Sequence, residues 1–176
     1  MVTEQDKTLQ ALQIAIQMEI DGKEYYLKAS QESSSELGKQ LLQSLADEED
    51  FHRQKFEEIY DAIRNEKAWP AVALWPDRGK GLRTVFAKAA EELGSNVEVL
   101  ATELDAIEKA MDMENKTYDF YKSQGGKASH GAEKNFYQSL AAEERGHHLA
   151  LLDYYEYLKD PAGWFVKKEH PSLDGG

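Results

Sequence analysis

Two stretches of the chain place a glutamate three residues before a histidine. "QSLADEEDFH" ends at His52 and "QSLAAEERGH" ends at His147, so the pattern recurs after 95 residues. On an α-helix, residues three apart leave from one face, which lets each stretch present a carboxylate and an imidazole to the same point. Carboxylate oxygens and imidazole nitrogens bind divalent transition metals, and the two stretches therefore indicate a metal site.

The same offset relates two further segments. "AIQMEIDGKEYY" over 15–26 falls on "AMDMENKTYDFY" over 110–121, which pairs Glu19 with Glu114 and Tyr26 with Tyr121. Glu19 interrupts a helical stripe that is otherwise mostly apolar. Because a single offset aligns all these segments, the chain is predicted to be a duplicated unit whose halves face each other about a pseudo-twofold axis.

Together these positions form a ligand set for two metal ions. One glutamate from each of two helices, with a Glu-x-x-His pair from each of two others, is the set found in di-iron and di-manganese carboxylate bundles. Four carboxylates would repel one another in a dry core, and two divalent cations would neutralise them. Carboxylates and imidazoles without a thiolate favour iron or manganese, although zinc could occupy the site. The predicted metal ligands are Glu19, Glu49, His52, Glu114, Glu144 and His147.

Two other interpretations stay open at this point. A lone Glu-x-x-His in an acid-rich helical chain usually belongs to a solvated face, although its duplication favours a site. The register is also open, because Glu48 with His52, or Glu143 with His147, would share a helix face at a spacing of four. Apart from Glu49, the acidic run "ADEED" is expected on the helix exterior.

The elements that must position these residues are helices. Good helix formers dominate the repeated segments, and all four prolines lie outside them. The apolar spacing predicts long helices over about 4–30, 102–125 and 129–160, and another that runs from a capping box of Ser33 and Glu36 to about residue 65. The connection over 66–101 contains one short helix at about 82–94. Two hairpins with a long crossover predict an all-α ferritin-like four-helix bundle over 1–160, followed by an irregular tail over 161–176.

The four ligand-bearing segments resemble those of a known family. "LADEEDFH" and "LAAEERGH", with "MEIDGKEYY" and "MENKTYDFY", are similar to segments of the rubrerythrin branch of the ferritin-like superfamily, and the resemblance covers roughly residues 5–159. It implies the register with Glu49 and Glu144, a di-iron centre, and reduction of hydrogen peroxide or dioxygen with electrons from an external donor. It also implies that Tyr26 and Tyr121, seven residues after their glutamates, hydrogen-bond to ligand carboxylates from the second shell of the site.

Three observations bear on how such a site would react. Peroxidase rubrerythrins usually carry a further carboxylate one turn after the third-helix glutamate, where this chain has Thr117. They also commonly carry a rubredoxin domain with Cys-ligated iron, and this chain has no cysteine, so its reductant is expected to be a separate molecule. Gly22, one turn after Glu19, is expected to leave a void beside the metals for a small oxidant.

The amino-acid composition indicates which classes of molecule the chain is expected to bind. The chain has 33 acidic and 21 basic residues and a net charge of −12, which makes nucleic acid and anionic membranes poor partners. No apolar run approaches the roughly 20 residues of a membrane span, and the polar start is unlike a signal peptide, so a cytoplasmic location is expected. A homodimer is also expected. The competing functions are an iron-storage protein with ferroxidase activity and a metal-free helical interaction module.

Overall fold

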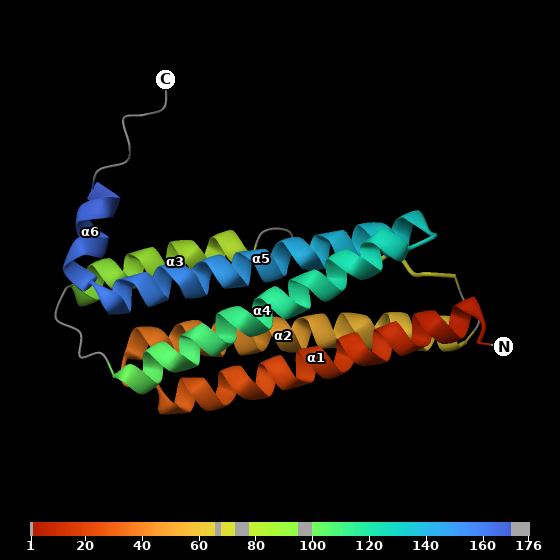
Figure 1. The fold of residues 1–176 in the computed structure, drawn as a ribbon, viewed down its shortest axis with the longest axis horizontal. Helices are drawn as coiled ribbons and strands as arrows, with labels where there is room; N and C mark the ends of the chain where they lie inside the picture. The colour runs from red at the N-terminus through yellow and green to blue at the C-terminus, as the bar shows by residue number, and fades with distance from the viewer. Residues whose placement is uncertain (1, 66–67, 73–77, 95–99, 170–176) are drawn as a thin grey trace, which may run out of the picture.

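The computed structural model describes residues 2–65, 68–72, 78–94 and 100–169, which form helices and no strand. Four long helices make the bundle and two shorter ones pack beside it (Figure 1). In chain order they are α1 (Glu4–Glu32), α2 (Glu36–Arg64), α3 (Arg78–Leu93), α4 (Ala101–Lys127), α5 (Gly131–Lys159) and α6 (Pro161–Glu169). The predicted all-α ferritin-like bundle is confirmed. None of the described helices is both long and apolar enough to span a bilayer.

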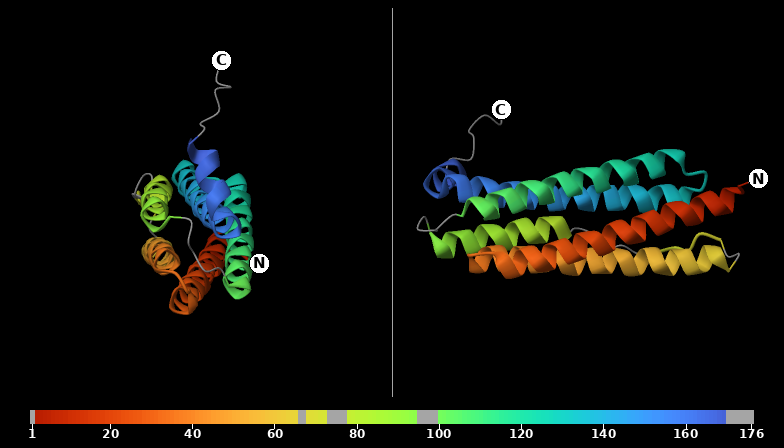
Figure 2. Two further views of the ribbon diagram at one scale, coloured as in Figure 1. Left: turned by 90° about the vertical axis from the view of Figure 1, so that its left-hand side faces the viewer. Right: turned by 60° about the horizontal axis from the view of Figure 1, so that its bottom comes forward.

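The bundle consists of two antiparallel hairpins, α1 with α2 and α4 with α5. The crossover carries the chain back along the bundle, so that α4 starts at the end where α2 starts (Figure 1). Within this crossover α3 packs against α5 and α2, outside the four long helices (Figure 2). The short helix predicted at 82–94 is therefore present and begins four residues earlier.

Several helix ends differ from the predicted ones. The N-cap of α2 is Ser35, whose hydroxyl accepts a hydrogen bond from the Gly38 amide at 2.9 Å, so the predicted capping box of Ser33 and Glu36 is wrong. Helix α4 starts at Ala101 without a side-chain cap. It also continues through Gly125, where a Cβ atom would lie 3.4 Å from Tyr137 Cβ. That glycine serves the close packing of α4 on α5 and does not end the helix.

The predicted irregular tail is wrong for residues 161–169, which form α6. Pro161 takes the first helical position, which suits its fixed φ, and the Gly163 amide donates to Asp160 Oδ1 at 3.0 Å. Trp164 is buried, and its ring centroid lies 5.6 Å from that of Phe86 and 5.7 Å from that of Tyr157. This aromatic contact fixes α6 against α3 and α5. The remainder of the predicted tail, 170–176, lies outside the described residues.

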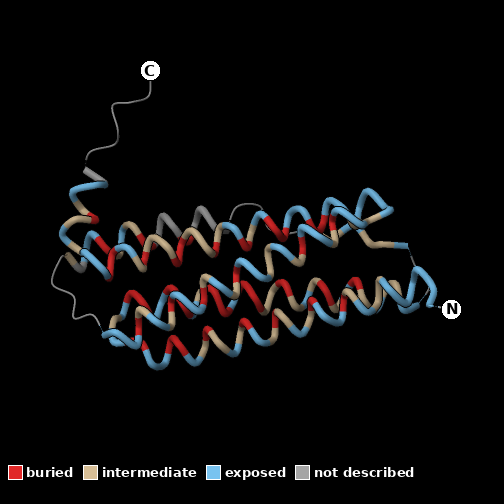
Figure 3. Tube along the Cα trace, in the orientation of Figure 1, coloured by how far each residue is buried: buried red, intermediate tan, exposed pale blue. Residues whose placement is uncertain are grey.

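Two apolar clusters fill the bundle, one toward each end. Buried positions recur along every long helix (Figure 3). Each of the four helices passes from one cluster to the other, and the predicted ligands stand between them: Glu19, for example, lies between Ala15 of one cluster and Tyr26 of the other. The middle of the bundle is therefore polar, and its two ends are apolar.

A buried carboxylate outside the predicted ligand set, Glu103, joins the turn between α1 and α2 to the other hairpin. Glu103 on α4 accepts hydrogen bonds from the hydroxyls of Ser33 at 2.5 Å, Ser34 at 2.6 Å and Tyr154 at 2.6 Å. Burial acts to raise the pKa of Glu103, but these hydrogen bonds outweigh it and hold the pKa below its ordinary value. Glu103 therefore stays ionised and ties α4 and α5 to the first hairpin.

Gly38→Ala tests how tightly this network is packed. A Cβ atom at Gly38 would overlap Ser33 Oγ and Tyr154 Oη and lie 2.8 Å from Glu103 Oε1. We expect a loss of about 1–3 kcal/mol in the free energy of unfolding, measured by urea denaturation, because overpacking outweighs the gain in helix propensity. The matched control is Gly126→Ala, where a Cβ atom would meet nothing within 4 Å and propensity should stabilise the protein by up to about 1 kcal/mol. Equal stabilisation in both variants would contradict the packing described here.

Candidate metal centre

The six predicted ligands meet in the middle of the bundle, and all are buried. None has more than 3% of its surface exposed. Such burial is unusual for acidic side chains unless an opposite charge is paired with them. Their donor atoms form two groups, each with all atoms within 4.8 Å of one another. Both groups contain Glu49 and Glu144, and the groups are Glu19, Glu49, His52 and Glu144, and Glu49, Glu114, Glu144 and His147. Two cations held there would share these two carboxylates.

Each histidine turns its Nδ1 atom toward the carboxylates. His52 Nδ1 lies 3.5 Å from Glu19 Oε2 and 3.3 Å from Glu144 Oε1. His147 Nδ1 lies 3.2 Å from Glu49 Oε1. The two imidazole rings, which the 95-residue offset relates, stack with centroids 5.6 Å apart. The Nδ1 atoms are therefore the nitrogens that could bind metal.

The other nitrogen of each histidine is held by the opposite half of the chain. His52 Nε2 lies 2.6 Å from Glu143 Oε2, and His147 Nε2 lies 2.7 Å from Glu48 Oε2. A carboxylate accepts a hydrogen bond from Nε2–H, which fixes the tautomer that leaves Nδ1 free for metal. Glu49 and Glu144 thus face the Nδ1 atoms, and Glu48 and Glu143 face the Nε2 atoms.

Glu48 corrects the expectation that the acidic run "ADEED", apart from Glu49, lies on the exterior, and Glu143 is its equivalent in the second half. Glu48 is buried and Glu143 is half-buried, because each reaches across the bundle to a histidine. The repeat could have predicted this role, because both equivalent positions, 48 and 143, are Glu. The preceding positions, Asp47 and Ala142, differ between the halves. An exterior position would not need to match between the halves.

The tyrosines bond to ligand carboxylates, as predicted, but across the bundle. Tyr26 on α1 donates to Glu114 Oε1 on α4, and Tyr121 on α4 donates to Glu19 Oε1 on α1. Each tyrosine therefore holds one oxygen of a glutamate from the other half. The second oxygens, Glu19 Oε2 and Glu114 Oε2, have no hydrogen-bond partner among the described residues.

Most of the other inward-facing donor atoms of the candidate ligands also lack a hydrogen-bond partner. This lack shows whether a pair of cations would fit the site. Among the described residues, the inward atoms without a hydrogen-bond partner also include Glu49 Oε1, His52 Nδ1, both Glu144 oxygens and His147 Nδ1. Burial, and then the neighbouring carboxylates, raise the pKa values of Glu49 and Glu144 well above that of a free glutamate. Unpaired buried oxygens and nitrogens that converge in this way are what divalent cations would satisfy. The residues fit a dinuclear metal centre.

Gly22 does not leave the predicted void. A Cβ atom at Gly22 would lie 2.8 Å from Glu49 Oε2 and 3.4 Å from its carboxyl carbon, so the Glu49 carboxylate already occupies the space beside the glycine. The glycine lets α1 and this carboxylate approach each other. Its role is to admit a ligand side chain and not an oxidant.

Other polar residues near the centre have local partners. The Thr117 hydroxyl donates to the Met113 carbonyl of its own helix at 3.0 Å, so this position offers no further carboxylate. His148 is half-buried, with Nδ1 3.4 Å from the Met111 carbonyl oxygen, and His130 is exposed. Neither histidine belongs to the ligand groups.

Replacing both shared carboxylates should remove the metals and keep the fold. In Glu49→Ala with Glu144→Ala we expect loss of the roughly two metal ions per chain that such a centre holds, by elemental analysis, with unchanged far-UV circular dichroism. The metal-free variant should melt at a higher temperature than the metal-free parent, because two mutually repelling groups are gone. Glu58→Ala with Glu156→Ala, at exposed positions on the same helices, is the matched control. Full occupancy in the first variant would refute the ligand register.

The crosswise bonds to the histidines should matter almost as much as ligands do. Glu48→Ala with Glu143→Ala leaves every ligand in place but removes the groups that hold Nε2, and we expect metal affinity to fall about 10–100-fold. Competition with a chromophoric chelator measures this fall. Asp47→Ala is the control, since Ala142 already occupies the equivalent position of the other half. An affinity equal to that of the parent would show that these carboxylates do not orient the histidines.

Comparison with known proteins agrees with this geometry. A search of curated proteins and a search of solved structures gave no significant match. A family model described as rubrerythrin matches residues 10–155, which include all six candidate ligands and both tyrosines. The match spans most of the sequence, and the chain belongs to the rubrerythrin family.

Proposed function

We propose that this protein is a di-iron oxidoreductase that reduces hydrogen peroxide or dioxygen with electrons from a separate donor. The observation that carries the proposal is the pair of buried ligand groups that share Glu49 and Glu144. Family membership supports a di-iron centre at this place. Bound iron would supply the redox chemistry, and shared carboxylates would keep two ions close enough to act on one oxidant.

The chain's own contribution is to hold four of the six candidate ligands at two points: Glu19, His52, Glu114 and His147. One atom is fixed by the opposite half, as with Glu19 Oε1 by Tyr121 and His147 Nε2 by Glu48, and the other atom faces inward. The inward atoms are thus positioned before a metal arrives, which lowers the cost of ordering them. The surrounding apolar clusters exclude bulk water from the reacting atoms.

Iron is favoured over softer metals because the donor set has oxygen and imidazole nitrogen and no thiolate. Thr117 provides no seventh ligand, which separates this chain from the peroxidase pattern and makes dioxygen as relevant an oxidant as peroxide. The reductant is external, since the chain has no cysteine to bind an iron of the rubredoxin type that would deliver electrons. A homodimer in the cytoplasm, without nucleic acid or membrane as partner, completes the proposal.

The test is a reaction of the anaerobic ferrous protein with each oxidant in turn. Stopped-flow absorbance should show rapid oxidation with peroxide, dioxygen or both, and a reductant should restore the ferrous protein for repeated turnover. The variant Glu49→Ala with Glu144→Ala is the negative control. If oxidised iron instead accumulates far beyond two ions per chain, and size exclusion shows a many-subunit shell, iron is cargo and the storage function replaces this one. If neither oxidant reacts, the proposal fails.

A further inference from the structure

The two halves of the repeat carry different charges at one part of the surface. In the first half, Lys23 Nζ on α1 lies 2.8 Å from Asp50 Oδ1 on α2, and the two groups neutralise each other. At the offset of 95 residues their equivalents are Tyr118 and Arg145, which cannot form an ion pair. The carboxylate of the first half is therefore replaced by a guanidinium in the second.

Arg145 lines a pocket of about 620 Å³ on α4 and α5, within the size range of small-molecule sites. Lys122 on α4 and Lys134 on α5 line the same pocket, and all three residues are exposed. No carboxylate of the described chain belongs to the lining or forms an ion pair with any of them. We term the site that these three residues line the basic pocket. Unpaired positive charges gathered in this way attract an anion.

Small residues make up much of the remaining lining of the basic pocket: Gly125, Gly126, Ala141 and Ala142. They let a ligand approach the backbones of both helices closely. A Cβ atom at Gly126 would meet nothing within 4 Å, so open space lies beside this glycine. A planar ring can therefore pack on glycine and alanine here, next to Tyr118.

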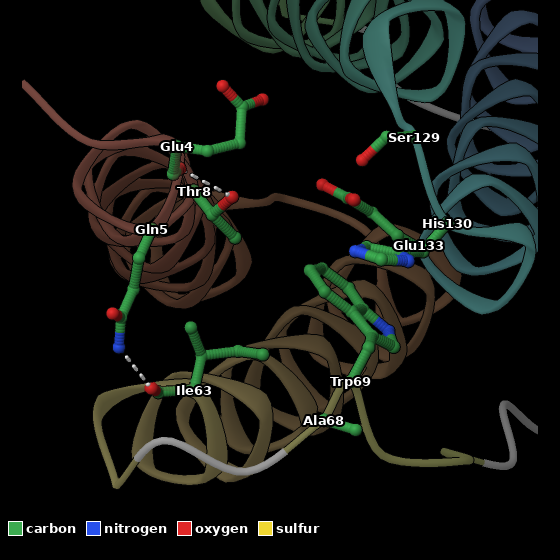
Figure 4. Close-up of a pocket in the computed structure, with 9 residues that line it drawn as sticks. All are labelled: Glu4, Gln5, Thr8, Ile63, Ala68, Trp69, Ser129, His130 and Glu133. Atoms are coloured by element: carbon green, nitrogen blue, oxygen red, sulfur yellow. Dashed lines mark hydrogen bonds between the residues drawn. The ribbon is translucent and has the colours of Figure 1, made fainter.

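Another pocket, of about 430 Å³, has carboxylates in place of these cations. Figure 4 shows Glu4 of α1 and Glu133 of α5 around it, together with His130 and Trp69. Its two carboxylates repel an anion, whereas the three cations of the basic pocket attract one. An anionic ligand is therefore expected at the basic pocket and not at this one.

We propose that the basic pocket binds a mononucleotide, a small molecule with a planar ring and a phosphate group. The Arg145 guanidinium can donate two parallel hydrogen bonds to a phosphate, and Lys122 and Lys134 add positive charge. The ring packs on the small residues between them. The net charge of −12 disfavours a long polyanion, which would extend beyond the pocket. This site is independent of the proposed di-iron function, because none of its lining residues belongs to the ligand groups.

Equilibrium dialysis of the purified protein against flavin mononucleotide tests the site, with riboflavin as the matched ligand that lacks the phosphate. We expect saturable binding of flavin mononucleotide below about 1 mM and at least about tenfold weaker binding of riboflavin. Adenosine monophosphate should compete, and inorganic phosphate at the same concentration should compete far less, since it has no ring. Added salt should weaken the binding, because exposed charges carry it.

Arg145→Asp gives the second half the residue that the first half has at this position. We expect the Kd for flavin mononucleotide to rise about tenfold or more, with unchanged far-UV circular dichroism. Arg145→Lys should raise the Kd less, because it keeps the charge and loses the paired hydrogen bonds. Lys109→Asp is the matched control: it changes the net charge equally, at an exposed position of α4 outside the pocket, and should leave the Kd unchanged.

The variant Glu49→Ala with Glu144→Ala separates this site from the metal centre, since a phosphate could also bind to a metal ion. Flavin mononucleotide should bind to it as to the parent. Loss of binding in this variant would overturn the site, as would equal Kd values for Arg145→Asp and the parent, or for flavin mononucleotide and riboflavin. Failure of the ferrous protein to react with either oxidant, with mononucleotide binding kept, would overturn the proposed function alone.

Discussion

The burial of four glutamates at one place is the constraint on which the rest of the structure depends. Carboxylates this close repel one another, and burial deprives them of water, so the raised pKa values of Glu49 and Glu144 report an unfavourable arrangement in the metal-free chain. Folding tolerates it because the two apolar clusters on either side bring the helices together. The free energy stored in this arrangement is what cations recover when they bind.

Each half of the chain holds candidate ligands of the other half by hydrogen bonds, which explains why a duplicated hairpin suits this centre. Tyr26 and Glu48 of the first half bond to Glu114 and His147 of the second, and the reciprocal bonds run the other way. No single hairpin contains both a ligand and the group that orients it. Assembly of the site therefore requires the two hairpins to dock, and the Glu103 network joins the same two hairpins at a distance from the candidate metal centre.

Most of the fold and of the candidate metal centre could be predicted from the sequence, because the repeat places the same residue types at equivalent positions. One offset located the six ligands and both tyrosines, and the helices followed from composition and apolar spacing. The hydrogen-bond partner of each tyrosine was not accessible: Tyr26 and Glu19 share a helix face, but the Tyr26 hydroxyl donates to Glu114 of the other half, which only the packing of the two hairpins decides. The helix after Pro161 was missed because its stability comes from Trp164 packing on Phe86, a tertiary contact that local pattern does not report. Gly22 was misjudged for the same reason, since a glycine's neighbour is visible only in three dimensions.

The polar middle flanked by apolar ends also bears on how ions enter and leave. Packing at either end does not depend on the centre, because each cluster buries its own large side chains. Binding or loss of ions would then require a local opening of the central turns of the four helices and not global unfolding. The two apolar clusters would hold the helices together in both states.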